Sequence, residues 1–238
     1  MCGIAAEIRF DGTSVDAASL HAMTSCQAHR GPDGSGLWIR NRVGLGHQRL
    51  AIIDLSEAGS QPMVDPETGL SIVFNGCIYN HHELREELHG LGHTFHSVSD
   101  TEVVAKAYAQ WGTDCVDHLY GMFAFVVFEH RSGRAILVRD RLGIKPMYLD
   151  ERPGMLRVAS TLQALLAAGG VDTSLDTTAL SYYMTFHSIV PPPRTILTGV
   201  KKLPPATIRI VEPDGSHRDR VYWEPEFTRD PERADWTE

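Results

Sequence analysis

The sequence predicts an α+β fold in which largely antiparallel sheets form the interior layers and helices pack outside them. Strand-like runs outnumber helical patterns, and short turns join most neighbouring strand-like runs. Short turns connect antiparallel strands, whereas parallel strands need long crossovers. With 238 residues, of which 42% are hydrophobic, the chain is long enough for one well-buried domain.

The N-terminal part is predicted to form a strand and then a helix. Residues Gly3 to Phe10 partly alternate between apolar and polar side chains, so a strand begins directly behind Cys2. From Ser14 to Ala28, apolar residues recur at helical spacing, which predicts an amphipathic helix. The helix is expected to end at the segment HRGPDG, where Gly and Pro break the pattern.

Three strands are predicted next, over Ser35 to Ile39, Val43 to Ile53 and Leu70 to Asn75. Asn75-Gly76 follows the third strand and is expected to form a turn. One interpretation is a plain hairpin turn, because Asn-Gly is the strongest short hairpin signal. The other is a turn that directs backbone N–H groups and an amide side chain at one spot.

Two helices should follow this turn. The first runs from His81 to Leu88, and the second opens at Ser99 and continues through Trp111. Ser99 and Glu102 have the spacing of a capping box, so Asp100 could simply belong to a helix start.

The C-terminal half is predicted to contain hairpins and two short helices. Strands are expected over Met122 to Glu129, Arg134 to Arg139, Pro146 to Leu149, Leu156 to Ala159, Ala206 to Val211 and Arg218 to Trp223. Helices are expected from Thr161 to Ala167 and from Thr177 to Met184, the latter capped by Asp176. Pro191 to Pro193 indicate an extended connector, and the charged, unpatterned stretch from Arg229 to Glu238 indicates a linker.

The composition argues against several classes of partner. The formal net charge is −8 and no basic cluster stands out, so nucleic acid and anionic membranes are not expected partners. No apolar stretch is long enough to span a membrane, and no secretion signal is visible. The four cysteines are scattered without a CxxC pair, which argues against a zinc site or a disulfide framework and fits a reducing cytoplasm.

Cys2 combines the two groups that a nucleophilic enzyme needs. Removal of Met1 would leave a thiol and a free α-amine on the same residue, and the amine can accept the proton of the thiol near neutral pH. The alternative is that Cys2 is merely a small buried hydrophobic residue.

Several spaced motifs occur in order along the chain: MCGI, HRGPDGSG, LGHQRLAIIDL, FNGCIYN, SDTEV, GMFAF and RDRLGIKPMY. Together they resemble the glutaminase domain of class II glutamine amidotransferases, an N-terminal nucleophile (Ntn) family, and most closely its asparagine synthetase branch. The resemblance implies an αββα sandwich of two mostly antiparallel sheets with helices outside. It assigns residues 2–226 to the glutaminase domain and 227–238 to a linker toward an ATP-dependent synthetase domain that is absent from this chain.

The resemblance also implies the reaction. Cys2 would attack the side-chain amide of glutamine, forming a glutamyl thioester and ammonia, and water would then release glutamate. The side chain of Asn75 and the N–H of Gly76 would be the oxyanion donors. No metal or cofactor is expected in this domain, because ATP and Mg²⁺ would belong to the synthetase domain.

Substrate-binding residues are implied by the same resemblance. Arg49 would clamp the α-carboxylate of glutamine and Asp100 would pair with its α-amino group, while Ile52 and Ile53 would line the pocket through backbone groups. One position departs from the pattern: many asparagine synthetases have Glu after Asn-Gly, where this chain has Cys77. Either Asp100 alone holds the amine or the pocket is rearranged.

Two further motifs admit two interpretations each. Arg30 and Asp33 lie in a family motif, but could also form a loop salt bridge. Residues 169–174, with the sequence GGVDTS, resemble the SGGxDS pyrophosphate loop of synthetases, but are better explained as the C-cap of the preceding helix.

The acceptor of the ammonia is less defined. The Asn-Gly-Cys variant, with FHSIVPPPRTIL and KKLPPATIRIVEPDG, is similar to the subgroup that amidates N-acetylglutaminylglutamine, and aspartate is the other acceptor. A stand-alone Ntn amidohydrolase acting on another amide, and a non-catalytic domain that binds glutamine or a partner, remain alternatives. Homo-oligomerisation is compatible with the sequence, which does not set the number of subunits.

Overall fold

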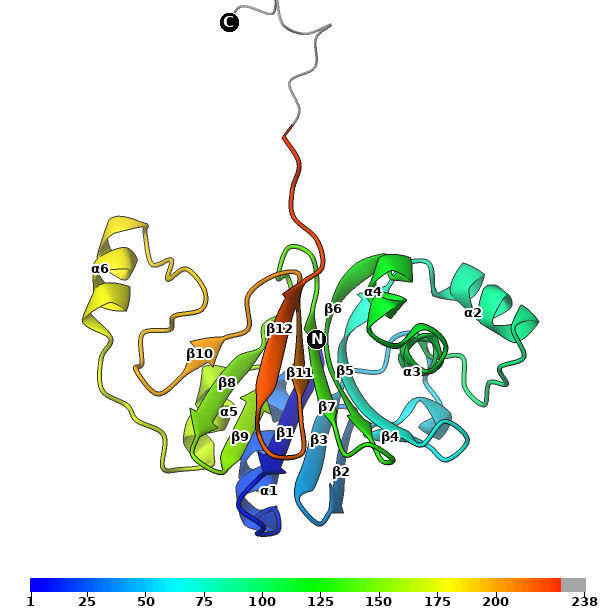
Figure 1. The fold of residues 1–238 in the computed structure, drawn as a ribbon, viewed down its shortest axis with the longest axis horizontal. Helices are drawn as coiled ribbons and strands as arrows, with labels where there is room; N and C mark the ends of the chain where they lie inside the picture. The colour runs from blue at the N-terminus through cyan, green and yellow to red at the C-terminus, as the bar shows by residue number, and fades with distance from the viewer. Residues whose placement is uncertain (228–238) are drawn as a thin grey trace, which may run out of the picture.

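The computed structural model describes residues 1–227 and contains two six-stranded antiparallel sheets (Figure 1). The first sheet has the strand order β10-β8-β9-β1-β3-β2, and its strands are β1 (Gly3–Arg9), β2 (Gly34–Arg40), β3 (Val43–Arg49), β8 (Tyr148–Arg152), β9 (Met155–Ala159) and β10 (Lys201–Lys202). The second has the order β12-β11-β7-β6-β5-β4, and its strands are β4 (Met63–Asp65), β5 (Leu70–Ile78), β6 (Gly121–Glu129), β7 (Ala135–Arg139), β11 (Thr207–Val211) and β12 (His217–Val221).

Most of the α-helices lie on the outer faces of the two sheets. The α-helices are α1 (Ala17–Ser25), α2 (His81–Gly90), α3 (Asp100–Trp111), α4 (Cys115–His118), α5 (Leu162–Ala167) and α6 (Thr177–Thr185). Helices α1 and α5 pack on the first sheet, while α2, α3 and α4 cover the second; α6 projects from the body (Figure 1). The predicted αββα arrangement is therefore confirmed.

Alternation along the strands produces these layers. On β6, Phe123, Phe125 and Val127 face the helices, whereas Ala124 and Val126 face the other sheet. This period of two is the geometry of a strand that is buried on both faces. The interior between the sheets is thus largely apolar.

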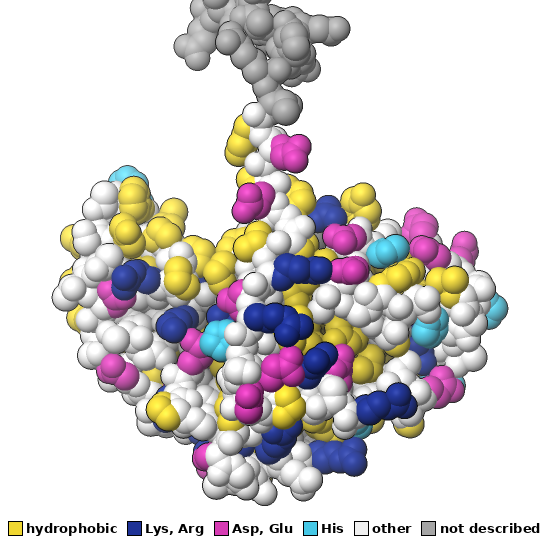
Figure 2. Space-filling model, in the orientation of Figure 1, with side chains coloured by type: hydrophobic (Ala, Val, Ile, Leu, Met, Phe, Trp, Pro, Cys, Tyr) yellow, Lys and Arg dark blue, Asp and Glu magenta, His cyan; other side chains and the backbone are white. Residues whose placement is uncertain are grey.

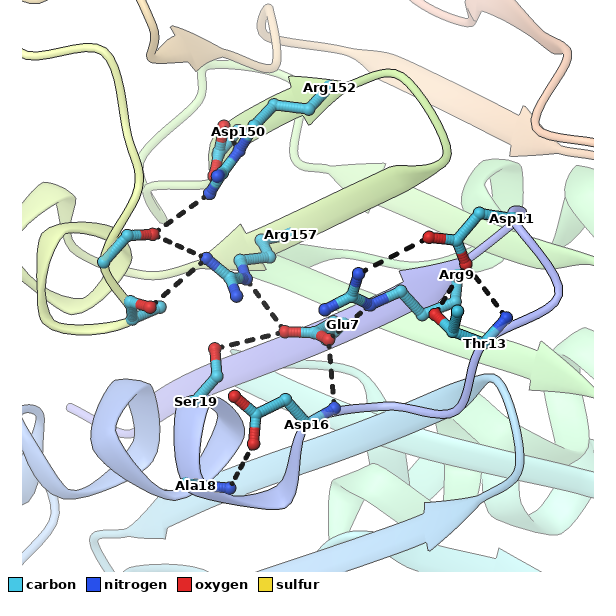
Figure 3. Close-up of polar contacts among 12 residues, drawn as sticks. Glu7, Arg9, Asp11, Thr13, Asp16, Ala18, Ser19, Asp150, Arg152 and Arg157 are labelled. Carbon is cyan, nitrogen blue, oxygen red and sulfur yellow. Dashed lines mark hydrogen bonds and ion pairs between the residues drawn. The ribbon is translucent and has the colours of Figure 1, made fainter.

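A buried carboxylate fixes the first strand, which follows Cys2. Glu7 on β1 is fully buried and accepts hydrogen bonds from Arg157 on β9 (2.8 Å), Arg9 (2.8 Å) and Ser19 on α1 (3.2 Å) (Figure 3). A buried carboxylate is tolerated only when it is paired and hydrogen-bonded. Glu7 therefore ties β1 to its neighbouring strand and to the helix that covers it.

The structure corrects the turn expected after β5. The strand does not end at Asn75 but continues to Ile78, and Asn75 and Gly76 pair with Ala124 and Phe123 of β6. Neither the hairpin turn nor the substrate-facing turn is present. Long-range pairing with β6 overrides the local turn preference of Asn-Gly.

Three smaller corrections concern the end of a strand, the length of a helix and the segment with the three prolines. Strand β3 ends at Arg49 rather than at Ile53, and α1 is shorter than the predicted helix. The prolines do not form an extended connector, because the Arg194 N–H closes a turn on the carbonyl of Pro191. Residues 228–238 of the predicted linker lie outside the described residues.

Two helix ends follow the sequence closely. Ser99 caps α3 by accepting from the Glu102 N–H, but the Glu102 carboxylate binds Ser97 and the His96 N–H instead of completing the capping box at Ser99. After α5, Gly169 has a positive φ of 75° and its N–H bonds the Leu166 carbonyl, as expected for a C-cap.

Candidate active site

The structure brings all eight proposed site residues to one cavity of about 270 Å³. They are Cys2, Arg49, Ile52, Ile53, Asn75, Gly76, Cys77 and Asp100. Cys2 directly precedes β1, Arg49 ends β3, and the others come from the loop after β3, from β5 of the second sheet and from the start of α3. A cavity of this size suits a ligand of amino-acid dimensions.

The Cys2 thiol lies at the end of β3. Because Gly3 pairs with Gln48 in an antiparallel register, Cys2 lies beside Arg49, the last residue of β3. The Leu50 N–H donates to Sγ at 3.4 Å, and Sγ lies 3.7 Å from the Leu50 carbonyl. Burial raises the pKa of the Cys2 thiol, while the Leu50 N–H lowers it.

Arg30 and Asp33 serve this end of the cavity separately. The Arg30 Nε donates to the Cys2 carbonyl at 3.1 Å, and the Asp33 carboxylate accepts from the Ala51 N–H at 2.9 Å. The alternative of a salt bridge between them is therefore wrong. Both residues hold backbone segments next to the thiol.

Asn75 presents a buried donor that has no partner. The residue is 1% exposed, and its Nδ2 makes no hydrogen bond within residues 1–227. Buried polar groups are nearly always satisfied, and an exception calls for an explanation such as an absent ligand. Asn75 lines the same cavity as Cys2.

The N–H of Gly76 also has no partner in the neighbouring strand, because it points away from β6. The N–H and carbonyl of Phe123, which pairs with Gly76, both bond Asp140 instead, so Gly76 and Phe123 are a non-hydrogen-bonded pair. On the same edge of β5, the N–H groups of Phe74 and Ile78 donate to Gln61 and Asp100. The Gly76 N–H lies between these two and faces the cavity.

Only glycine fits at position 76. An added Cβ would lie 2.5 Å from the Met122 carbonyl and 2.6 Å from the Phe74 ring. These contacts are too short for any side chain, which explains why the strand carries glycine at a paired position.

Arg49 is held by carbonyl and hydroxyl groups rather than by a carboxylate. Its Nη1 donates to the Ser56 carbonyl (2.9 Å) and the Ser60 hydroxyl (3.4 Å), and its Nη2 donates to the Asp54 carbonyl. Two of its five donors, on Nε and Nη2, have no partner within residues 1–227. The guanidinium is therefore oriented, has no carboxylate partner among residues 1–227 and can receive the carboxylate of a ligand.

Asp100 and Cys77 form the opposite rim. The Asp100 carboxylate accepts from the Ile78 N–H at 3.0 Å and lies at the N-terminus of α3. Burial raises the pKa of the Asp100 carboxyl, and the Ile78 N–H opposes the shift. Burial also raises the pKa of the half-buried Cys77 thiol, with Asp100 as the second cause, so Cys77 supplies no negative charge for an amine.

The cavity is also lined by residues that the sequence did not single out, among them Leu50, Gly59, Gln61 and Lys145. Leu50 acts through its backbone, which no side-chain pattern reveals. Gln61 bridges β5 and α3, since it accepts from the Phe74 N–H (2.6 Å) and donates to the Thr101 hydroxyl (3.0 Å). Lys145 lies in the RDRLGIKPMY motif, which was the available signal.

A family model of the glutamine amidotransferase domain matches residues 1–223. The chain belongs to this family. Among curated relatives, asparagine synthetase [glutamine-hydrolyzing] 3 of Bacillus subtilis strain 168 is 36% identical over all of this chain and 39% of its own length. Asparagine synthetase [glutamine-hydrolyzing] 1 of the same strain is 38% identical over 87% of this chain and 32% of its own length. The chain thus spans well under half the length of these two relatives.

Solved structures show the same fold. The glutamine phosphoribosylpyrophosphate amidotransferase from B. subtilis, complexed with ADP and GMP, superposes with a TM-score of 0.69 over 94% of this chain and 50% of its own chain, at 18% identity. This likeness confirms the fold, and the glutamine amidotransferase family to which the domain belongs is a family of enzymes. Among the described residues, no helix has both the length and the apolarity to cross a membrane.

Proposed function

We propose that this domain hydrolyses glutamine to glutamate and ammonia through a thioester on Cys2. After removal of Met1, the α-amine takes the thiol proton and the sulfur attacks the amide carbon. The C–N bond then breaks, and the amine returns the proton to the leaving ammonia. Water adds to the thioester, the sulfur leaves as a thiol, and glutamate is released.

The observation that supports this proposal most directly is the unpartnered Asn75 amide in the same cavity as the Cys2 thiol. With the Gly76 N–H, it offers two donors for the oxygen of a tetrahedral intermediate. Arg49 has free donors for the α-carboxylate, and Asp100 can accept from the α-amine. Cys77 leaves this amine contact to Asp100.

The test begins with mass spectrometry of the N-terminus, followed by glutamate release from glutamine by the processed chain. C2A should abolish release, and N75A should reduce kcat by about 10²–10³. Hydrolysis of another amide but not of glutamine would favour a stand-alone Ntn amidohydrolase. Binding of glutamine without release, by a chain with a processed terminus, would favour a non-catalytic domain.

We further propose that the ammonia serves an ATP-dependent amidation in a longer protein located in the cytoplasm. The lengths of the curated relatives support a following synthetase domain, which would hold ATP and Mg²⁺. Hydrophobic side chains gather over α6 and the loop after it, where Met184, Phe186 and Ile189 are exposed (Figure 2). This surface suits a partner domain.

The acceptor is either aspartate or N-acetylglutaminylglutamine. The full-length protein, supplied with glutamine, ATP and Mg²⁺, should consume ATP with only one of the two. The four cysteines are free in the structure, which agrees with a reducing compartment.

A further inference from the structure

Lys145 is a buried lysine held in a tightly fixed loop between β7 and β8. Lys145 as a whole residue is 3% exposed. The Asp140 carboxylate accepts from the N–H groups of Ile144 and Lys145 at 2.8 and 2.9 Å, and Arg139 donates to the Lys145 carbonyl at 2.9 Å. The backbone of Lys145 is therefore positioned by two charged side chains that are themselves buried.

The ammonium of Lys145 has no protein partner, although the residue as a whole is buried. Within residues 1–227 its Nζ makes neither an ion pair nor a hydrogen bond. The comparison with Lys106 is informative, because that lysine is 1% exposed and pairs with Asp65 at 2.7 Å and Glu67 at 3.2 Å. A buried ammonium normally needs such compensation. Lys145 keeps an uncompensated charge where Lys106 does not.

Lys145 belongs to the lining of the candidate active site. It lines the same cavity as Cys2, Asn75 and Cys77. Burial and then the charge of Arg30 lower the pKa of Lys145, while Asp140 and the two thiols raise it. No carboxylate makes an ion pair with the Lys145 ammonium among residues 1–227, so the Cys2 sulfur and a bound substrate in the same cavity are groups that its charge can serve.

We propose that Lys145 is a further residue of the active site, whose ammonium stabilises the negative charge that develops on the Cys2 sulfur and on the glutamine amide oxygen. This inference rests on the proposed glutamine hydrolysis. Arg49 is assigned to the α-carboxylate, so Lys145 serves the reacting end of the same substrate. Positive charge fixed in a water-poor cavity stabilises a transition state strongly, because it needs no reorganisation during the reaction.

The test compares K145M, K145R and the control K202M, all with Met1 removed as verified by mass spectrometry. Lys202 is also partly buried, but its Nζ donates to the Val190 carbonyl (2.7 Å) and lies outside the cavity. Three measurements are made: the pH profile of iodoacetamide alkylation of Cys2, followed on the N-terminal peptide; kcat and KM for glutamine; and the melting temperature.

K145M should shift the alkylation profile of Cys2 upward by about one pH unit and lower kcat about 10²-fold with little change in KM. Its melting temperature should not fall, because the substitution removes an unpaired charge and keeps an apolar side chain of similar length. K145R should retain most of the activity and a profile near that of the unmodified chain, and K202M should match the unmodified chain in both.

An unchanged alkylation profile together with a kcat within about threefold of the unmodified chain would overturn the inference. A K145M chain that fails to fold or melts at a markedly lower temperature would assign Lys145 a structural role and also overturn it. If the unmodified chain does not hydrolyse glutamine, the proposed function fails, whereas the alkylation profile and melting temperature still decide the role of Lys145.

Discussion

The imidazole of His47 on β3 lies 3.3 Å from the backbone carbonyl of Phe74 on β5, although the two strands belong to different sheets. Cys2 precedes β1, the neighbour of β3, and Asn75 directly follows Phe74. The contact thus joins the sheet that carries the thiol to the strand that carries the unpartnered amide. Because a carbonyl can only accept, Nε2 must carry a proton, and burial lowers the pKa of His47 to about 4, so near neutral pH the ring is the neutral tautomer with its proton on Nε2.

We predict that stability falls as the pH drops from about 6.5 toward 4. Burial lowers the pKa of His47 from 6.5 to about 4. Between these values the unfolded chain binds a proton that the folded chain does not, so acid favours unfolding by about 3 kcal/mol in total from this residue. Urea unfolding at several pH values measures this loss.

H47Q provides the control, since glutamine keeps a donor but does not titrate in this range. The pH dependence between 6.5 and 4 should be smaller in H47Q, whatever its absolute stability. His130, whose pKa burial also lowers, will leave a residual slope. Equal slopes in H47Q and the unmodified chain would contradict the prediction.

G76A should destabilise the domain and impair catalysis. The added Cβ would meet the Met122 carbonyl and the Phe74 ring, and overpacking of this kind costs typically about 1–3 kcal/mol. The matched control is G90A at the end of α2, where an added Cβ has no atom within 4 Å. G90A should leave the free energy of unfolding unchanged or raise it by about 0.5–1 kcal/mol. Chemical denaturation of both variants, with glutamate release, decides the case.

E7Q should be strongly destabilising, although Glu7 is outside the cavity. Glutamine at this position leaves the charge of Arg157 without its carboxylate, and breaking a buried pair typically costs about 3–5 kcal/mol. The exposed Glu86 supplies a control, since E86Q should change the free energy of unfolding by less than about 0.5 kcal/mol. If the two variants unfold at similar urea concentrations, the Glu7 network is not what stabilises β1.

The fold was predictable because hydrophobic alternation and turn chemistry are local signals. The course of β5 was not, because Asn75-Gly76 has the local signature of a turn and only pairing with β6 keeps it in the strand. The proposed site residues could be named from ordered motifs, but their contacts could not. The local sequence does not indicate that the N–H groups of Phe74 and Ile78, on either side of Gly76, donate to side chains. Nor does it indicate that the Lys145 ammonium has no bonding partner.

Gly59 controls the position of the Arg49 guanidinium, which is the proposed substrate clamp, without contacting the reacting groups. An added Cβ at this position would lie 2.6 Å from Nη2 of Arg49 and 2.9 Å from Cβ of Asp54. The end of the arginine side chain is the more mobile of these neighbours, so G59A should displace the guanidinium. The free donors of Arg49 would then miss the α-carboxylate of glutamine.

G59A is therefore expected to raise KM for glutamine about tenfold or more while kcat changes less, since the clamp acts in the ground state and the transition state alike. R49K should show the same pattern, because an ammonium cannot form a two-donor fork. Steady-state kinetics across glutamine concentrations measures both. A G59A chain with unchanged KM would show that the Arg49 guanidinium tolerates displacement, and a fall in kcat alone would instead indicate that Gly59 acts on the thiol end of the cavity.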